Sequence, residues 1–217
     1  MRQKRKSRKL IQIYQKLYNS IGPRKWWPGD SPFEVIIGAI LTQNTSWKNV
    51  EKAIEALKEK NLLDPLKLYN LKEEPLAKII KSSGFFHVKA KRIKSFMAFL
   101  FENYQGDIEK MFSEKLTPLR ERLLKINGIG PETADSILLY AGRKPIFVVD
   151  AYTKRILIRH NLISKVARYS EIQELFMQNL EKDVRMFNEY HALLVYIAKN
   201  FCMKRIPNCE SCPIRGL

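Results

Sequence analysis

Apolar residues recur every three or four positions along almost the whole chain, which is the spacing of amphipathic helices. Near the N-terminus this pattern includes Leu10, Ile11, Ile13, Tyr14, Leu17 and Tyr18. The segment Ser31-Pro32-Phe33-Glu34 has the form of a capping box with proline at the first helical position, and it opens an apolar run that ends at Leu41. The pattern therefore predicts a chain built from successive helices.

Ser46 is expected to cap a helix that has Trp47, Val50, Ile54 and Leu57 on its inward face. Two further helices are expected to run from Thr117-Pro118 through Ile126 and from Pro131 through Ala141. The remaining expected helix starts are marked by Asp64-Pro65, Glu74-Pro75 and Gly84. Only residues 145–149 resemble a strand, and they are too short and isolated to start a sheet. We therefore expect an all-α fold of two helical lobes, formed by residues 32–144 and by residues 1–31 with 145–217.

Among the features of composition, only the charge points to a class of partner. Lys and Arg number 39 against 22 Asp and Glu, which gives a formal net charge of +17 and a pI near 9.8. Such an excess favours nucleic acid, although a ribosomal or thermophilic lysine-rich surface would give the same balance. No run of eighteen apolar residues is present and the basic N-terminus lacks a signal-peptide core, so we expect an intracellular protein of the cytoplasm or nucleoid without a membrane span.

The sharpest motif lies at residues 124–134, where a tight turn joins two expected helices (about 118–141). Gly128 and Gly130 flank Ile129, and Pro131 pre-sets the first turn of the next helix. The N–H groups at such a turn suit a DNA phosphate, a contact that positions a protein without reading sequence. An ordinary helical hairpin is the alternative. We expect the DNA contacts to come from Asn127, Gly128, Ile129, Gly130 and Thr133.

From Ser31 nearly to its end, the chain resembles the helix–hairpin–helix DNA glycosylases of the endonuclease III superfamily. The shared motifs are Ser31-Pro32-Phe33-Glu34, Leu41-Thr42-Gln43-Asn44-Thr45, Gly84-Phe85-Phe86-His87-Val88-Lys89-Ala90, the hairpin, Val148-Val149-Asp150 and the terminal cysteines. The resemblance implies a monomeric enzyme of base excision repair that flips a damaged base out of double-stranded DNA, with the active site in a cleft between the lobes.

By this resemblance Asp150 is the catalytic carboxylate. Breaking an N-glycosidic bond builds positive charge on the sugar, which a fixed carboxylate stabilises while it orients or deprotonates water. Asp150 also suits a helix N-cap, and the two roles are compatible. Family members that cut the strand carry a Schiff-base lysine where this chain has Glu132, so we expect no lyase activity unless Lys125 or Lys154 substitutes.

The tryptophans narrow the resemblance to the 3-methyladenine glycosylase branch. Trp26, Trp27, Pro28 and Trp47 are expected to line a base pocket, because indole faces attract a cationic alkylated purine; core packing is the alternative. The resemblance also implies that Gln43 fills the gap left by the extruded base and that Phe85 wedges the other strand. A glycosylase for oxidised pyrimidines or mismatched bases, and a non-catalytic DNA-binding module, remain open.

The chain's three cysteines are Cys202, Cys209 and Cys212, all near its C-terminal end. This clustering suggests metal rather than a disulfide in an intracellular protein. In superfamily members with a [4Fe–4S] cluster, five residues follow the third cysteine and then a fourth cysteine, which here would be position 218, one past the end of this sequence. A [4Fe–4S] cluster is therefore expected in the 202–217 loop, with a zinc site or a metal-free remnant as alternatives.

Overall fold

The computed structural model describes residues 2–24 and 26–217, and within them every regular element is helical. No strand occurs in these residues, and residues 145–149 form an extended connector, so the expected all-α class is confirmed. The elements are α1 Arg2–Ile21, α2 Pro32–Leu41, α3 Trp47–Glu59, α4 Pro65–Asn70, α5 Glu73–Ile79, η1 Lys81–Ser83, α6 Phe86–Tyr104, α7 Ile108–Ser113, α8 Leu116–Leu124, α9 Pro131–Ser136, η2 Ile137–Ala141, α10 Ala151–Arg159, α11 Tyr169–Met177 and α12 Val184–Asn200.

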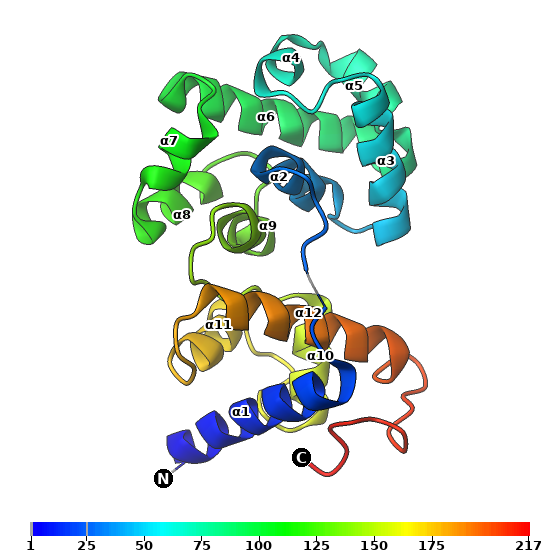
Figure 1. Ribbon diagram of the computed structural model, residues 1–217, viewed down its shortest axis with the longest axis vertical. Helices are drawn as coiled ribbons and strands as arrows, with labels where there is room; N and C mark the ends of the chain where they lie inside the picture. Colours follow the sequence, from blue (N-terminus) through cyan, green and yellow to red (C-terminus); the bar gives the residue numbers. More distant parts are fainter. Residues whose placement is uncertain (1, 25) are drawn as a thin grey trace. The chain divides into compact units, whose positions relative to one another are not determined.

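The chain divides into two compact units, of which one joins its two ends, residues 1–27 and 145–217. In this unit α12 packs against both α1 and α10 (Figure 1). Its core contains the stacked rings of Phe147 and Phe176, with centroids 3.7 Å apart. The buried Tyr190 hydroxyl donates a hydrogen bond of 2.9 Å to the Leu10 carbonyl and so joins α12 to α1. The connector before α10 is thus part of a packed core.

The other unit consists of residues 28–144 and is built around α2. Every residue of α2 after Pro32 is buried, and the helix contacts α3, α6, α9 and η2 (Figure 1). This complete burial agrees with the continuous apolar run of the sequence, since a helix that is apolar on all sides belongs in a core. The loops that follow α2 and precede α6 are therefore carried on a rigid centre.

Most helix starts follow the local capping signals, and the exceptions are informative. The Ser31 hydroxyl accepts the Glu34 N–H at 3.2 Å, as expected, but the Glu34 carboxylate accepts the N–H of Asp30 instead of Ser31. Ser46 stands at the N-cap of α3 without a side-chain cap bond. Trp47, expected on the inward face of that helix, is only half-buried. The expected capping box and inward tryptophan therefore need correction.

A buried ion pair joins the two helices that enclose the hairpin. Arg120 of α8 donates from Nε and Nη2 to the two carboxylate oxygens of Asp135 in α9, at 2.6 and 3.0 Å. The Asp135 side chain is fully buried and the Arg120 side chain is 26% exposed. Two parallel charge-assisted hydrogen bonds fix both distance and orientation, so this pair sets the angle at which the helices leave the turn.

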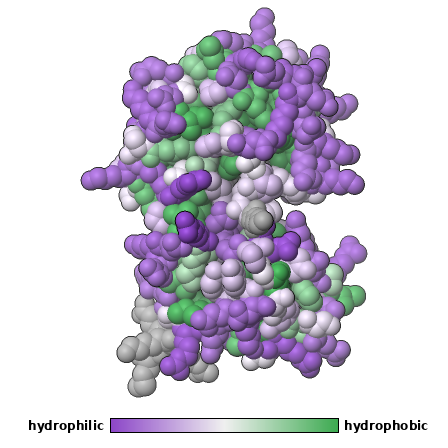
Figure 2. Space-filling view, in the orientation of Figure 1, coloured by the Kyte–Doolittle hydropathy of each residue, from purple (hydrophilic) through white to green (hydrophobic). Residues whose placement is uncertain are grey.

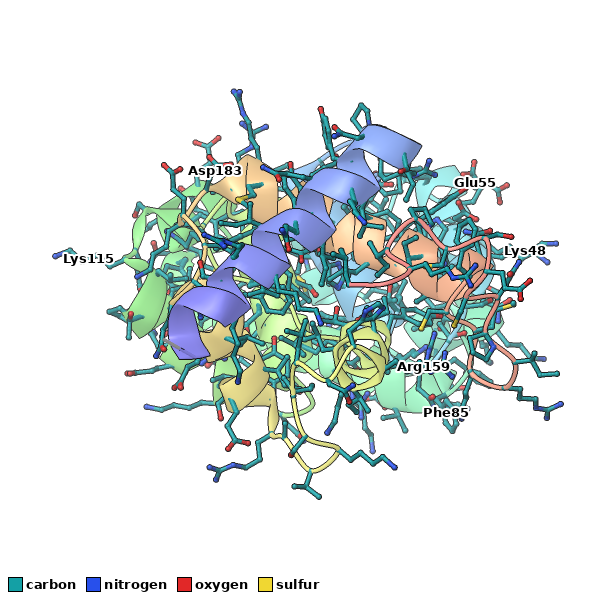
Figure 3. All side chains as sticks on the ribbon, turned by 90° about the horizontal axis from the view of Figure 1, so that it is seen from below. Lys48, Glu55, Phe85, Lys115, Arg159 and Asp183 are labelled. Carbon is teal, nitrogen blue, oxygen red and sulfur yellow. The ribbon has the colours of Figure 1, made fainter. Side chains whose placement is uncertain are left out.

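The surface is mainly hydrophilic on the face shown in Figure 2, with smaller apolar areas between the polar side chains. Lys48 and Glu55, on the exposed side of α3, are two of the charged residues that project outward (Figure 3). None of the described helices combines the length and apolar character that a membrane span requires.

Candidate active site and nucleic-acid interface

The expected hairpin is present between α8 and α9. The N–H of Ile129 donates to the Ile126 carbonyl at 3.0 Å and closes the turn, while both isoleucine side chains are buried. Gly128 has φ +84°, a left-handed conformation that favours glycine. Gly130 is different, because its φ is −89° and a Cβ there would meet nothing within 4 Å. Glycine at 130 thus leaves open space at the start of α9.

Gln43 lies against this hairpin. Its amide Nε2 donates to the Gly128 carbonyl at 3.0 Å and to the Thr133 hydroxyl at 2.8 Å, and its Oε1 accepts a hydrogen bond from Arg92 of α6. The structure therefore brings together two predicted DNA-contacting elements, the Gln43 loop and the hairpin. Thr133 itself is buried, so its hydroxyl serves this contact inside the unit.

Phe85 is the most exposed of the predicted site residues with a large apolar side chain, at 65% of its surface (Figure 3). It precedes α6 in a left-handed conformation, with φ 47° and ψ 35°, which is sterically unfavourable for an aromatic residue. Beneath it, the buried Lys89 ammonium donates to the carbonyls of Ser83, at 2.6 Å, and Leu41, at 2.8 Å. Burial, and next the charge of Arg92, lower the pKa of Lys89 to about 8. This cation ties the Phe85 loop to the end of α2.

Asp150 occupies the N-cap of α10, as its sequence context suggested. Its Oδ1 accepts the Thr153 N–H at 2.6 Å, and its Oδ2 lies 3.6 Å from Nε2 of His191 on α12. The carboxylate is 12% exposed and the imidazole 7% exposed. Both oxygens are thus oriented by the protein, one by a backbone donor and the other by a ring.

The electrostatics of Asp150 favour its ionised form. Burial alone would raise the pKa of this carboxyl, but the His191 ring outweighs it, together with hydrogen bonds from the backbone and side chain of Thr153. The pKa of Asp150 therefore lies below its ordinary value. The protein holds a buried carboxylate that keeps its negative charge, which is the state that can stabilise a developing cation.

Trp26 and Trp27 form an edge-to-face pair, with ring centroids 5.4 Å apart, and both are half-buried. The Arg24 N–H donates to Glu189 of α12 at 2.6 Å, and its guanidinium lies 4.5 Å from the ring centre of Tyr196, so the segment before the tryptophans is anchored on α12. Pro28, which follows them, is exposed. Both indoles are thus partly exposed, and their contact with a base stays a prediction.

Trp47 begins α3, and its indole N–H donates to the Glu51 carboxylate one turn later, at 2.6 Å. The polar edge of the Trp47 indole is thus bonded within α3. Glu132 is exposed in the first turn of α9, at the position where a lyase lysine would stand. Neither residue departs from its predicted element, and their roles in catalysis stay predictions.

The cysteine segment is held by two arginines of α10. Arg155 donates to the carbonyls of Cys202, at 2.8 Å, and Ala198, at 3.1 Å. Arg159, labelled in Figure 3, donates to the carbonyls of Met203 and Lys204 and lies 3.1 Å from the Cys202 sulfur. The helix that begins at Asp150 therefore supports the start of this segment.

The thiols themselves are free, with Cys202 buried, Cys212 half-buried and Cys209 exposed. Burial, and then the neighbouring Cys202 and Cys209 thiols, raise the pKa of Cys212. In the described part of the chain no three Cys, His, Asp or Glu side chains are arranged as metal ligands. The donor types suit an iron–sulfur cluster, but the chain supplies three of the four thiolates that such a cluster uses.

Three residues of this region had no place in the sequence-based prediction. Arg92 and Lys89 occur in a helix with many basic residues, where no local signal separates an interior cation from a surface one. His191 carried a weak signal, because it interrupts the apolar run of α12. Its partner, however, is 41 positions earlier in the chain (Asp150 to His191), and only the tertiary structure reveals that pairing.

Comparison with known proteins agrees with this arrangement. The family model described as HhH-GPD superfamily base excision DNA repair protein matches residues 37–182. A protein of Methanocaldococcus jannaschii with the provisional name DNA repair glycosylase is 49% identical over 207 residues, covering 95% of this chain and 94% of that protein. Endonuclease III of Thermotoga maritima is 32% identical over 185 residues, covering 85% and 81% of the two chains.

Among solved structures, the H. pylori 3-methyladenine DNA glycosylase bound to 1,N6-ethenoadenine has a TM-score of 0.78 and 28% identity. The alignment covers 90% of this chain and 99% of that one. The match therefore extends over both units. The chain belongs to the HhH-GPD superfamily of base excision DNA repair proteins and is, by class, a DNA glycosylase.

Proposed function

We propose that this protein is a monofunctional glycosylase that removes an alkylated purine, such as 3-methyladenine, from double-stranded DNA. The observation that carries the proposal is Asp150, a nearly enclosed carboxylate that keeps its charge because His191 and Thr153 offset the effect of burial. A fixed negative charge of this kind is what a glycosidic bond needs when it breaks with cationic character on the sugar.

In the proposed reaction the bond between C1′ of the sugar and the base nitrogen breaks, and its electron pair leaves with the base. An N3-alkylated purine is cationic while attached and departs neutral, so no acid is needed to protonate the leaving group. The Asp150 carboxylate stabilises the positive sugar and accepts a proton from the water that attacks C1′. The products are a free base and an abasic site in an uncut strand.

The selectivity of the proposed enzyme comes from indole faces. Trp26 and Trp27 are half-buried and stand in the same unit as Asp150, and Trp47 has its N–H bonded to Glu51. A flat cation gains roughly 0.5–2 kcal/mol from an aromatic face, which a neutral base does not. The H. pylori glycosylase, which is named for 3-methyladenine, supports this choice among the substrates of the superfamily.

A panel of duplexes tests the substrate. Each would carry one lesion, and released base would be measured directly and after alkali. We expect free 3-methyladenine from alkylated DNA and little release of thymine glycol, uracil or mismatched adenine. Trp27→Ala should impair release of the alkylated base much more than it weakens binding to undamaged duplex. Efficient excision of an oxidised or mismatched base, without activity on alkylated purines, would assign the enzyme to the endonuclease III-like alternative.

Glu132 leads to a separate prediction about mechanism. A carboxylate cannot form a Schiff base with the opened sugar, so borohydride added during turnover should trap no protein–DNA adduct on a denaturing gel. The strand should break only after alkali. A trapped band would show that another amine, such as Lys125 or Lys154, attacks the sugar, and variants of these two lysines would identify it.

We propose that the unit of residues 28–144 provides the contacts that dock the protein on DNA. Among the hairpin residues Asn127, Gly128, Ile129 and Gly130, the Ile129 N–H closes the turn, so the backbone N–H groups of the other three are the proposed donors to DNA, and open space at Gly130 would admit a phosphate oxygen. Phe85 is exposed and held in a strained conformation, as suits an apolar wedge that enters a base stack. The net charge of +17 provides long-range attraction to the duplex.

Cys202, Cys209 and Cys212 would hold three corners of a [4Fe–4S] cluster, together with a fourth ligand that the present sequence does not contain. A cluster bound there would stabilise the fold of the C-terminal segment and would present Lys204 and Arg205 toward DNA. Anaerobically purified protein should then be yellow-brown, with broad absorption near roughly 400 nm. Colourless protein that contains zinc, or no metal, would overturn this assignment.

A further inference from the structure

The side chain of Arg92 connects three elements within the unit of residues 28–144. It extends from α6, seven positions after Phe85, and its Nη1 donates to Oε1 of Gln43. The amide of Gln43 in turn donates to the Gly128 carbonyl at 3.0 Å and to the Thr133 hydroxyl at 2.8 Å. Arg92 therefore reaches the hairpin through Gln43. The exposed Phe85 is the N-cap residue of the same helix, α6.

Arg92 also touches the hairpin directly. A Cβ built on Gly128 would lie 2.3 Å from Cγ, 2.6 Å from Nε and 2.7 Å from Cδ of Arg92. Glycine is thus required at 128 for two reasons, its positive φ and the arginine stem that covers this side of the turn. The steric contact is independent of the hydrogen bond to Gln43, and both place the same side chain against the same turn.

We propose that Arg92 is a positioning residue for DNA docking, which holds the hairpin turn and Gln43 in a fixed arrangement with the Phe85 loop. The proposal rests on the proposed DNA-binding role of the hairpin. Arg92 acts through its neighbours rather than as a phosphate ligand, because its Nη1 is bonded to Gln43 and its stem is packed on Gly128. Without it, Gln43 loses the partner of its carbonyl oxygen and the turn loses one wall.

Binding to an undamaged duplex, measured by fluorescence anisotropy at several salt concentrations, tests this role. Arg92→Met should raise Kd about tenfold, yet leave the slope of log Kd against log salt concentration at its wild-type value. Lys91→Met is the matched control, since it removes one positive charge from an exposed neighbour on α6. A slope reduced by about 0.9, the value for one lost phosphate contact, would make Arg92 a direct ligand and overturn the proposal.

A double-mutant cycle with Gln43→Ala supplies a readout that general destabilisation would not reproduce. If Arg92 acts through Gln43, Arg92→Met should weaken DNA binding less in the Gln43→Ala background than in the wild type. If the fold-increases in Kd of the two single variants multiply in the double variant, the two residues act independently and the proposal is contradicted. Should Arg92→Met fail to fold in a thermal unfolding assay, Arg92→Lys takes its place, because it keeps charge and stem but cannot copy the guanidinium bond.

Gly128→Ala separates this proposal from the one on which it rests. The added Cβ collides with Arg92 and strains the backbone, so duplex affinity should fall. If Gly128→Ala binds like the wild type, the hairpin does not dock DNA and the docking role proposed for it fails. If it weakens binding while both Arg92 variants bind normally, only the positioning role of Arg92 is refuted.

Discussion

Replacing Asp150 with asparagine should lower single-turnover release of the damaged base at least about a hundredfold, equivalent to about 2.7 kcal/mol of barrier. Duplex affinity should stay within a few-fold of the wild type, because the asparagine keeps the size of the side chain. It also keeps the cap of α10, since asparagine caps helices as well as aspartate does. What the variant loses is the charge opposite the developing cation.

Asp183→Asn is the matched control for this experiment. Asp183 (Figure 3) caps α12 in the same unit and accepts the Met186 N–H at 2.6 Å, much as Asp150 accepts that of Thr153. The substitution makes the same chemical change at a helix N-cap, and activity should be unaffected. If Asp150→Asn retained more than about a tenth of wild-type turnover, a factor worth roughly 1.4 kcal/mol, the catalytic assignment would be wrong.

His191 gives the same assignment a pH signature. The pKa of Asp150 is depressed, so its active, ionised form is lost only as pH falls below the ordinary carboxyl range. Release measured between about pH 5 and 7 should therefore show no acid limb from this group. In His191→Asn the largest influence that opposes burial is removed, so the pKa of Asp150 should rise and the acid limb should lie at higher pH than in the wild type.

Asp135→Ala should have the largest effect on folding, lowering the free energy of unfolding by about 3 kcal/mol. The alanine leaves the Arg120 guanidinium without two hydrogen bonds in a site that is mostly closed to water. For a chain of this size the melting temperature should fall by roughly 6–12 °C. Thermal unfolding followed by circular dichroism would measure the change.

Glu121→Ala serves as the control, because Glu121 is the exposed neighbour of Arg120 on α8 and its loss should shift stability by less than about 0.5 kcal/mol. Joint replacement of the pair, as Arg120→Met with Asp135→Leu, should recover much of the lost stability. If Asp135→Ala melted like the wild type, the ion pair would not be what holds α8 and α9 in their arrangement.

The helices and the hairpin turn could be predicted because their signals are local. Pro32, Asp64 and Pro131 determine backbone angles or cap bonds within one turn, and the buried Ile126 and Ile129 follow from their spacing around the glycines. Local signals failed where two donors compete for one acceptor, as when Glu34 bonds Asp30 instead of Ser31. At Gly130 the φ is negative, so the open space beside it, and not a left-handed conformation, is the feature that glycine provides there.

The partners of the site residues could not be predicted, because each comes from a distant part of the chain. Nothing around Gln43 indicates that its amide meets the hairpin 85 positions later at Gly128. Arg92 and Lys89 are both cations in a basic helix. Only the packing of α6 on the end of α2 determines that Arg92 bonds the Gln43 amide, whereas Lys89 bonds two backbone carbonyls. The sequence therefore indicates the type of chemistry, whereas the tertiary structure supplies its orientation.

Arg155 and Arg159 bind five backbone or sulfur atoms at residues 198–204, on the helix whose first turn bears Asp150. This dependence restricts how the C-terminal segment and α10 can evolve. A lineage that lost the cysteine segment would leave the Arg159 guanidinium without these acceptors and Arg155 with the Ala198 carbonyl alone, and would favour shorter or apolar residues at 155 and 159. The two regions should thus vary together across the superfamily, and the identity of residues in the middle of α10 should indicate whether a cysteine loop follows.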